Sequence, residues 1–424
     1  MCHHDRGYTI PVNLRNREET EIRRRSTMPA VAATTVDGIL KKLKDLTPLI
    51  EAHSDEAEQN RCVSEKVSRA MLENGFFRMM RPESVGGPGL DPVTCFRMIE
   101  EMSRTDSAVG WNVALANGFE PFGAWGSKEL VLSVMSSDDT VLCGGFFPPR
   151  KAVKVDGGYR LSGRTQFNSN CNAATWICGE ALVFESEDAS EPLKYESGAP
   201  MTILTFFPIK EAEIIENWDT LGMCGTGSHD VEVTDVFVPK EHTAPFVPLT
   251  EPEPEYAGPL HRLSIWPAIA AVAAPSLGIA QAAIDDFIEL GKKVPSYTSN
   301  SLASRPVVQT QLGEAEAKLA AARALFHNTY DEMWQKALDG EYLELEDRSK
   351  CQMACSYAVT TSAEAVDLIH LAAGSSAIRN ERRFQRHFRD IHVLTQHAFV
   401  SQSRLQSVGQ ISLGLEPEWP FFAL

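Results

Sequence analysis

Apolar residues recur at helical intervals of three and four positions early in the chain. The members of this stripe are Ile39, Leu43, Leu46 and Ile50. A Gly- and Pro-rich loop follows at 81–89, and helical spacing resumes over Pro92–Asn117. Within that stretch Asp106 or Ser107 is expected to cap the second of two helices by accepting hydrogen bonds from its first amides. We therefore predict an N-terminal α-helical domain over residues 31–139.

The hydrophobic period changes from helical to alternating near Thr140. Alternating residues flank Asp156-Gly157-Gly158, a combination typical of a β-hairpin because these residues tolerate a positive φ. Further strands are expected at 176–184, 201–207 and 231–238. This pattern predicts a middle β domain over residues 140–250, which ends in a Pro- and Glu-rich linker.

Helical spacing returns beyond Tyr256 and continues to the end of the chain. One long stripe consists of Leu312, Ala315, Leu319, Ala322 and Phe326, and a second runs over 351–371. The small alanines allow helices to approach closely. We predict a C-terminal four-helix bundle over residues 251–424, an α+β fold overall, and a disordered leader at 1–30.

Composition restricts the possible partners. The 57 acidic residues outnumber the 40 Lys and Arg residues and give a formal charge of −17, which argues against nucleic acid as a partner. The apolar stretch Ile265–Ile284 contains prolines and a glutamine, so a packed core helix is favoured over a membrane span. Nine cysteines without a CxxC pair favour reduced thiols and a cytoplasmic location.

Several common motifs are missing. No GxGxxG or Walker A sequence is present, so nicotinamide binding of the Rossmann type is not expected. His387, His392 and His397 would point in different directions on one helix, and we predict no metal site there. Arg386 and Asp390 are four residues apart, which suggests an ion pair, and Asp390 and His397 would share a face. A purely structural role for this group remains an alternative.

Four segments, in this order, resemble the acyl-CoA dehydrogenase superfamily. They are Leu161–Asn170, Trp218–Ser228, Asp235–Pro239 and Arg386–Asp390. The resemblance covers the chain from about Val36 onward. It implies an N-terminal helical domain, a β-barrel-like middle domain and a C-terminal four-helix bundle.

The glutamate base of the dehydrogenases is missing from the matching positions. The residue eight positions after Asp390 is Ala398, and no Glu occurs from Arg382 to Leu415. His397 stands near that position, as in the flavin-dependent monooxygenases of this superfamily. That resemblance implies the oxygenase component of a two-component system. Such an enzyme receives reduced FMN or FAD from a separate reductase and uses a C4a-hydroperoxyflavin to oxygenate an aromatic or heteroaromatic molecule.

The monooxygenase resemblance also implies roles for individual residues. Ser169 would hold the proton at flavin N5, and His397 would stabilise the peroxide or accept a phenolic proton. The other expected cofactor contacts are Phe167, Asn168, Arg305, Gly374, Ser375 and Ser376, and the expected substrate contacts are Trp111 and Asn117.

Some alternatives stay open at this point. One is an acyl-CoA dehydrogenase-type flavoprotein with an unusual base, such as Asp230 or His397, and another is a noncatalytic helical assembly. The dehydrogenases carry an Arg that would correspond to Thr298 here, and its absence favours FMN over FAD. Family members commonly form homotetramers through the bundle, which we also expect for this chain.

Overall fold

The computed structural model describes residues 36–123, 125–245, 256–294, 300–380 and 383–424. The expected leader at 1–30 and most of the expected acidic linker lie outside these residues. The N-terminal helices are α2 (Val36–Asn60), α3 (Glu65–Glu73), α4 (Pro92–Thr105), α5 (Ser107–Gly123) and α6 (Lys128–Leu130). The capping prediction is confirmed, because Asp106 Oδ1 accepts hydrogen bonds of 3.0 Å from the amides of Ala108 and Val109.

The middle segment forms one mixed sheet. Its strands are β1 (Leu142–Cys143), β2 (Arg150–Val155), β3 (Gly158–Thr165), β4 (Trp176–Phe184), β5 (Thr202–Pro208), β6 (Glu213–Ile215), β7 (Asp230–Pro239) and β8 (Thr243–Pro245). The order across the sheet is β6-β7-β3-β2-β4-β5-β8, with β1 beside β4. The predicted hairpin is confirmed, since β2 and β3 pair antiparallel and Gly157 has a φ of 77° at their turn.

The C-terminal segment is helical. It contains α7 (Pro259–Arg262), α8 (Trp266–Gly291), α9 (Pro306–Leu338), α10 (Leu345–Ala373), α11 (Phe384–Leu394) and α12 (Leu405–Ser412). α8 packs on α10, and α4 and α5 cover its other side. A Cβ on Gly278 of α8 would lie 2.0 Å from the Glu100 carbonyl oxygen of α4, so glycine permits this close contact.

α8 is long and apolar enough to cross a membrane, yet 89% of its most apolar window is buried inside the protein. This burial favours the core-helix interpretation of the apolar stretch. Cys351 and Cys355 are also fully buried, and all eight cysteines in the described ranges are free. Burial raises the pKa of Cys355 to about 12, so this thiol stays protonated at neutral pH.

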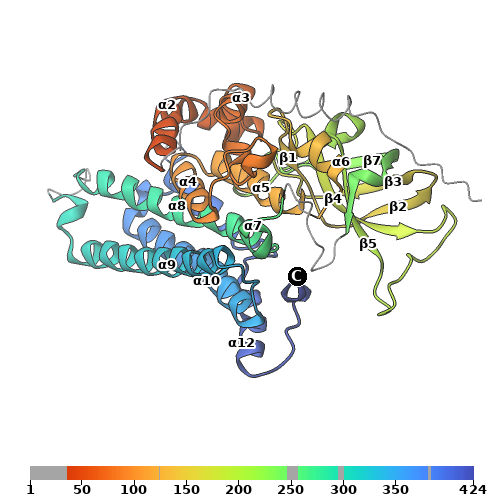
Figure 1. Ribbon diagram of the computed structural model, residues 1–424. Helices are drawn as coiled ribbons and strands as arrows, with labels where there is room; N and C mark the ends of the chain where they lie inside the picture. Colours follow the sequence, from red (N-terminus) through yellow and green to blue (C-terminus); the bar gives the residue numbers. More distant parts are fainter. Residues whose placement is uncertain (1–35, 124, 246–255, 295–299, 381–382) are drawn as a thin grey trace, which may run out of the picture.

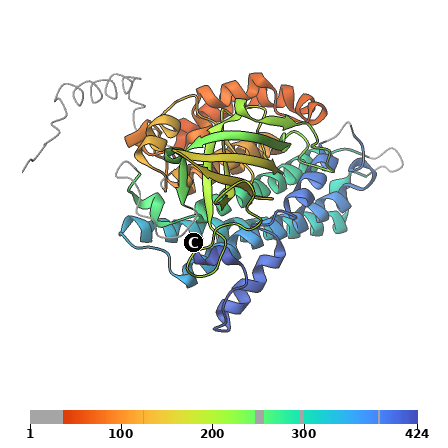
Figure 2. The ribbon, with the colours of Figure 1, turned by 90° about the vertical axis from the view of Figure 1, so that its right-hand side faces the viewer.

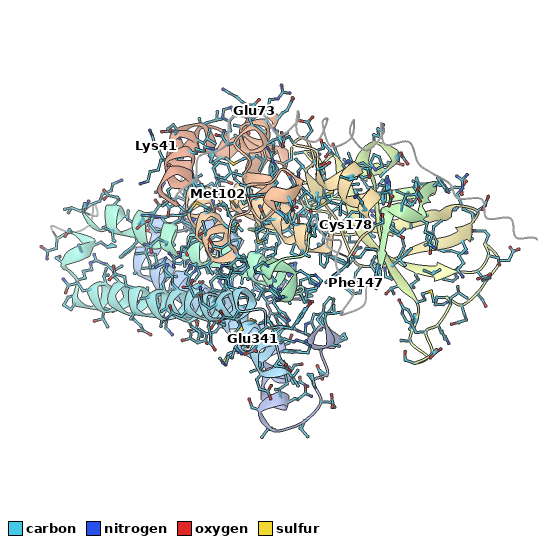
Figure 3. All side chains as sticks on the ribbon, viewed as in Figure 1. Lys41, Glu73, Met102, Phe147, Cys178 and Glu341 are labelled. Atoms are coloured by element: carbon cyan, nitrogen blue, oxygen red, sulfur yellow. The ribbon has the colours of Figure 1, made fainter. Side chains whose placement is uncertain are left out.

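The helices and the sheet lie side by side in the molecule (Figure 1). The sheet occupies one end, the long helices α8, α9 and α10 extend away from it, and α5 and β1 lie between the two parts. Figure 2 shows the same arrangement from the sheet side. In Figure 3, Met102 of α4 marks the helical core, and Cys178 of β4 marks the part of the sheet near the helices; both are fully buried. Residues from all three segments can therefore meet at the junction.

Candidate active site

Trp111 of α5 and Ser169 of the loop after β3 meet at this junction. The indole Nε1 of Trp111 donates a hydrogen bond of 3.0 Å to Ser169 Oγ. Both side chains are buried. Trp111 was expected to contact substrate, which stays a prediction; the structure shows that its polar atom holds the predicted catalytic serine.

A row of hydroxyl groups continues from Ser169. Ser169 Oγ lies 2.7 Å from Ser228 Oγ, and Ser228 Oγ lies 2.6 Å from Thr226 Oγ1. Thr226 Oγ1 donates a 2.9 Å hydrogen bond to the Met223 carbonyl. Sequence reasoning missed Ser228 and Thr226 as site residues, although they belong to the Trp218–Ser228 segment that carried part of the family resemblance.

Asp390 anchors the loop that contains these hydroxyl groups. Its Oδ1 accepts a 2.6 Å hydrogen bond from the Met223 amide, and its Oδ2 accepts one of 2.5 Å from Ser107 Oγ. Burial raises the pKa of Asp390 to about 6. The predicted Arg386–Asp390 ion pair is wrong, because Arg386 extends to Asp55 of α2 at 2.6 Å while Asp390 turns toward the loop.

His397 also contacts Trp111. The two rings meet edge to face with centroids 5.4 Å apart. The expected shared helix face with Asp390 is wrong, because α11 ends at Leu394 and His397 belongs to the turn beyond it. One aromatic side chain nevertheless brings Ser169 and His397 to the same site.

His397 is neutral at physiological pH. Desolvation lowers its pKa to about 4. Its Nδ1 accepts a 3.3 Å hydrogen bond from the Phe399 amide, so the neutral ring carries its proton on Nε2. Within the described ranges Nε2 makes no hydrogen bond to another residue, which leaves an N–H donor for a ligand.

An aromatic cluster lies next to His397 and reaches it through Phe399. The aromatic cluster consists of Phe146, Phe399, Trp419 and Phe421. Phe399 contacts His397 with ring centroids 5.4 Å apart and Phe421 at 5.1 Å. The C-terminal end of the chain therefore packs against the residues beside His397, which sequence reasoning did not anticipate.

Phe167 and Asn168 precede Ser169 in the loop. Phe167 has a φ of 62°, is 61% exposed and meets Trp218 edge to face. Asn168 is fully buried, and its amide bonds the carbonyls of Thr165 and His229 at 2.9 and 3.2 Å. Phe167 thus offers an apolar ring beside Ser169, while Asn168 fixes the shape of the turn.

Comparisons with known proteins identify the family. The family model described as "Acyl-CoA dehydrogenase, N-terminal domain" matches residues 45–131, and "Acyl-CoA dehydrogenase, C-terminal domain" matches 270–402. The indole-3-acetate monooxygenase of Acinetobacter baumannii is 30% identical over 389 residues, which cover 91% of this chain and 95% of that protein. The chain belongs to the flavin-dependent monooxygenases of the acyl-CoA dehydrogenase fold.

Two further comparisons agree with this assignment. The oxygenase component of the FADH2-dependent resorcinol hydroxylase of a Rhizobium species is 25% identical, covering 90% of this monooxygenase and 95% of that protein. The crystal structure of the 3-HSA hydroxylase from a Rhodococcus species matches with a TM-score of 0.81 and 25% identity, over 89% and 97% of the two chains. The hypothesis of a noncatalytic assembly is therefore wrong.

The structure gives Asn117 of the monooxygenase a different role from the expected one. Its Oδ1 accepts a hydrogen bond from the Met80 amide, and its Nδ2 donates to the carbonyls of Phe76 and Val113. With its amide engaged on both sides and fully buried, Asn117 holds the chain around Phe76 and Met80 against α5. We therefore leave it out of the proposed substrate site.

Arg305 and Gly374–Ser376 lie away from this site. Gln352, near the start of α10, donates to the Phe399 carbonyl at 2.9 Å, whereas Gly374 follows the last residue of the same helix. At 1.5 Å per residue these positions are about 30 Å apart. Arg305 precedes α9, which starts at the same end of the bundle in Figure 1. These residues do not meet Ser169 or His397 within one chain.

The three histidines near the C-terminus occupy separate places in the monooxygenase. His387 bonds Asp286 and His392 bonds Asp367, each at 2.9 Å, while His397 contacts Trp111. No group of three His, Cys, Asp or Glu side chains in the described parts of the chain could hold a metal ion.

The residues at the junction suit a flavin ring. Asn112 Nδ2 donates to Asn170 Oδ1 at 3.1 Å, and this leaves Asn112 Oδ1 and Asn170 Nδ2 buried and without a hydrogen-bond partner among the residues that the structure describes. One acceptor and one donor thus remain next to Trp111 and Ser169 in the sequence. Together with the exposed ring of Phe167, they match a planar heterocycle whose edge carries both N–H and C=O groups.

Proposed function

We propose that this monooxygenase is an oxygenase component that receives reduced FMN or FAD from a separate reductase and oxygenates an aromatic or heteroaromatic small molecule. The observation that carries the proposal is that Trp111 contacts both Ser169 and His397. When bound, the reduced flavin supplies the electrons that split O2 between substrate and water. The protein binds and orients the flavin and the substrate, and it excludes bulk water from them.

Ser169 holds a proton at flavin N5 in this proposal. Its Oγ is buried beside Trp111, where bulk water has little access. Phe167 packs against the flavin ring system. Asn168 holds the turn in the shape that presents Phe167 and Ser169 to the flavin.

His397 acts as a hydrogen-bond donor toward the reacting oxygen atom or a phenolic oxygen of the substrate. A pKa of about 4 makes its ring a poor proton acceptor at neutral pH, so the Nε2 proton is the group that it offers. The aromatic cluster beside it supplies faces and edges against which a flat substrate ring packs. The names of two relatives, for indole-3-acetate and resorcinol, support an aromatic substrate.

The alternative of a dehydrogenase with Asp230 as its base is weaker. Asp230 is buried and already bonds Arg164 at 2.8 Å, so its carboxylate is not free. His397 is likewise a poor base for a carbon-bound proton, because its pKa is low and its Nδ1 lone pair already accepts the hydrogen bond from the Phe399 amide.

The remaining expected cofactor contacts lie at the far end of the helical bundle. Because Gly374–Ser376 and Arg305 lie toward the end of the bundle away from the site of their own chain, they contact flavin phosphate only across a subunit boundary, in a homotetramer formed through the bundle. FMN is preferred, since Thr298 replaces the arginine of the dehydrogenases. The free thiols favour a cytoplasmic enzyme. The net charge of −17 argues against a nucleic-acid partner, and the burial of α8 argues against a membrane partner.

Mixing the anaerobic protein and photoreduced FMN or FAD with oxygenated buffer tests this proposal. The enzyme is expected to bind the reduced flavin and to reoxidise it on a time course different from that of free flavin, with product formed when an aromatic substrate is present. Reoxidation that matches free flavin for both cofactors would contradict the proposal. Bleaching of bound oxidised flavin by an acyl-CoA would establish the dehydrogenase instead.

A further inference from the structure

The hydroxyl groups behind Ser169 have a fixed direction of hydrogen bonding. The direction follows from the two ends of the row. Trp111 Nε1 can only donate, and the Met223 carbonyl can only accept. Each hydroxyl in between has one proton to donate.

The single proton of Thr226 is used on the Met223 carbonyl at 2.9 Å. Thr226 must therefore accept at its 2.6 Å contact with Ser228, which makes Ser228 the donor there. Ser228 in turn accepts from Ser169 across 2.7 Å. The proton of Ser169 thus points toward Ser228 and away from the junction.

This direction decides what Ser169 offers to a ligand. Its Oγ accepts from Trp111 and donates to Ser228, and one lone pair remains. A hydroxyl in this state accepts a further hydrogen bond but has no proton to give. It suits a reduced flavin, whose N5 carries a proton, and does not suit an oxidised flavin, whose N5 has only a lone pair.

We propose that Thr226 and Ser228 are positioning residues that make Ser169 a hydrogen-bond acceptor and so favour flavin protonated at N5. This inference rests on the proposed function, because it takes Ser169 as the partner of N5. To donate to oxidised N5, the whole row would have to reverse, and Thr226 Oγ1 would then face the Met223 carbonyl with a lone pair at 2.9 Å. The loss of that hydrogen bond corresponds to about tenfold in an equilibrium constant.

The Met223 carbonyl keeps other partners whichever way the row runs. It also accepts from Trp218 Nε1 at 3.0 Å and from the Thr226 amide at 3.2 Å. Since those contacts hold the loop, removal of the Thr226 hydroxyl alone is expected to change the proton direction without unfolding the segment.

The test compares dissociation constants for reduced and oxidised FMN, measured by anaerobic and aerobic equilibrium dialysis. In the Thr226→Val variant Ser228 no longer has an acceptor at Thr226, so the row is free to reverse. The ratio of the oxidised to the reduced dissociation constant is expected to fall about tenfold, which equals a decrease of about 30 mV in the potential of the bound flavin. Thr226→Ser keeps the hydroxyl and should keep the wild-type ratio.

Two further variants keep the test decisive. Thr205→Val removes a buried threonine hydroxyl that bonds a carbonyl, that of Gly179, elsewhere in the sheet, and should leave the ratio unchanged. Ser228→Ala releases the Ser169 proton directly and should lower the ratio about as much as Thr226→Val. It therefore tests the same role independently if Thr226→Val does not fold.

Three outcomes separate the possibilities. A ratio in folded Thr226→Val or Ser228→Ala within twofold of wild type would overturn the positioning role while leaving the proposed function intact. A fall in the ratio in both, with Thr226→Ser and Thr205→Val unchanged, supports it. Absence of flavin binding by the wild-type enzyme in either redox state would overturn the proposed function and this inference with it.

Discussion

The indole ring of Trp111 meets the imidazole ring of His397 edge to face, with ring centroids 5.4 Å apart. The same indole donates its only proton to Ser169. A helix of the N-terminal domain therefore sets the distance between one candidate residue from the β domain and another from the end of the bundle. The predictions below depend on this arrangement.

Replacing Trp111 with Phe keeps an aromatic ring against His397 but removes the hydrogen bond to Ser169. We expect the product formed per flavin oxidised to fall about threefold to tenfold, because Ser169 loses the donor that fixes its orientation. Product and hydrogen peroxide are measured in the same reaction. Trp176→Phe, which changes an indole that contacts His242 instead, serves as control. Equal coupling in both variants would remove Trp111 from the mechanism.

The His397→Ala variant should lose the N–H donor at the site. Product per flavin oxidised is expected to fall at least tenfold, and His397→Gln, which retains a side-chain N–H group, should recover part of it. His392→Ala removes a histidine whose partner is Asp367 and should behave as wild type. Unchanged coupling in His397→Ala would show that this residue takes no part in the reaction.

The pKa of His397 predicts a pH dependence of stability. The unfolded residue binds a proton near pH 6.5 and the folded one only near pH 4, so wild type loses stability as the pH falls through this window. His397→Gln lacks this loss. The slopes of the free energy of unfolding against pH should therefore differ between the two proteins by at most about 1.4 kcal/mol per pH unit. Urea unfolding across the window measures it. The raised pKa of Asp390 acts in the opposite direction and is common to both proteins. Parallel profiles would contradict desolvation of a neutral His397.

Removal of the Asp390 carboxylate should weaken the attachment of the Met223 loop. Asp390→Ala leaves the Met223 amide and the Ser107 hydroxyl without their acceptor, and we expect a loss of about 2–4 kcal/mol in the free energy of unfolding. Asp390→Asn retains one acceptor oxygen and should lose less. A stability of Asp390→Ala within 1 kcal/mol of wild type, taken as about the error of such a comparison, would contradict the anchoring role.

The sequence was sufficient for the long helices, the longer strands and their order, but not for the short strands β1, β6 and β8. The expected strand at 176–184 coincides with β4, and the stripe that includes Leu319 and Phe326 is buried on α9. These elements were predictable because each has one apolar face with a clear period. The apolar stretch within α8 was correctly placed in the core, since its prolines and small residues suit packing between helices.

The site was less accessible to sequence reasoning. Ser169 and His397 both contact Trp111. The partners of Asp390 could not be read from helical spacing, because Met223 and Ser107 lie 167 and 283 residues away in the chain. The same is true of Ser228, whose role depends on a contact across 59 residues. Spacing along one helix predicts neighbours on that helix only, and tertiary contacts decided which way these side chains turn.

A single turnover under 18O2 tests the central claim most directly. Anaerobic enzyme with photoreduced FMN is mixed with 18O2 and an aromatic probe, indole-3-acetate or resorcinol, and the products are analysed by mass spectrometry. The proposed function predicts a product with one atom of 18O, formed without NADH or a reductase because the flavin arrives already reduced. Complete reoxidation of the flavin with all of the label recovered as hydrogen peroxide or water, for every aromatic probe tested, would contradict it.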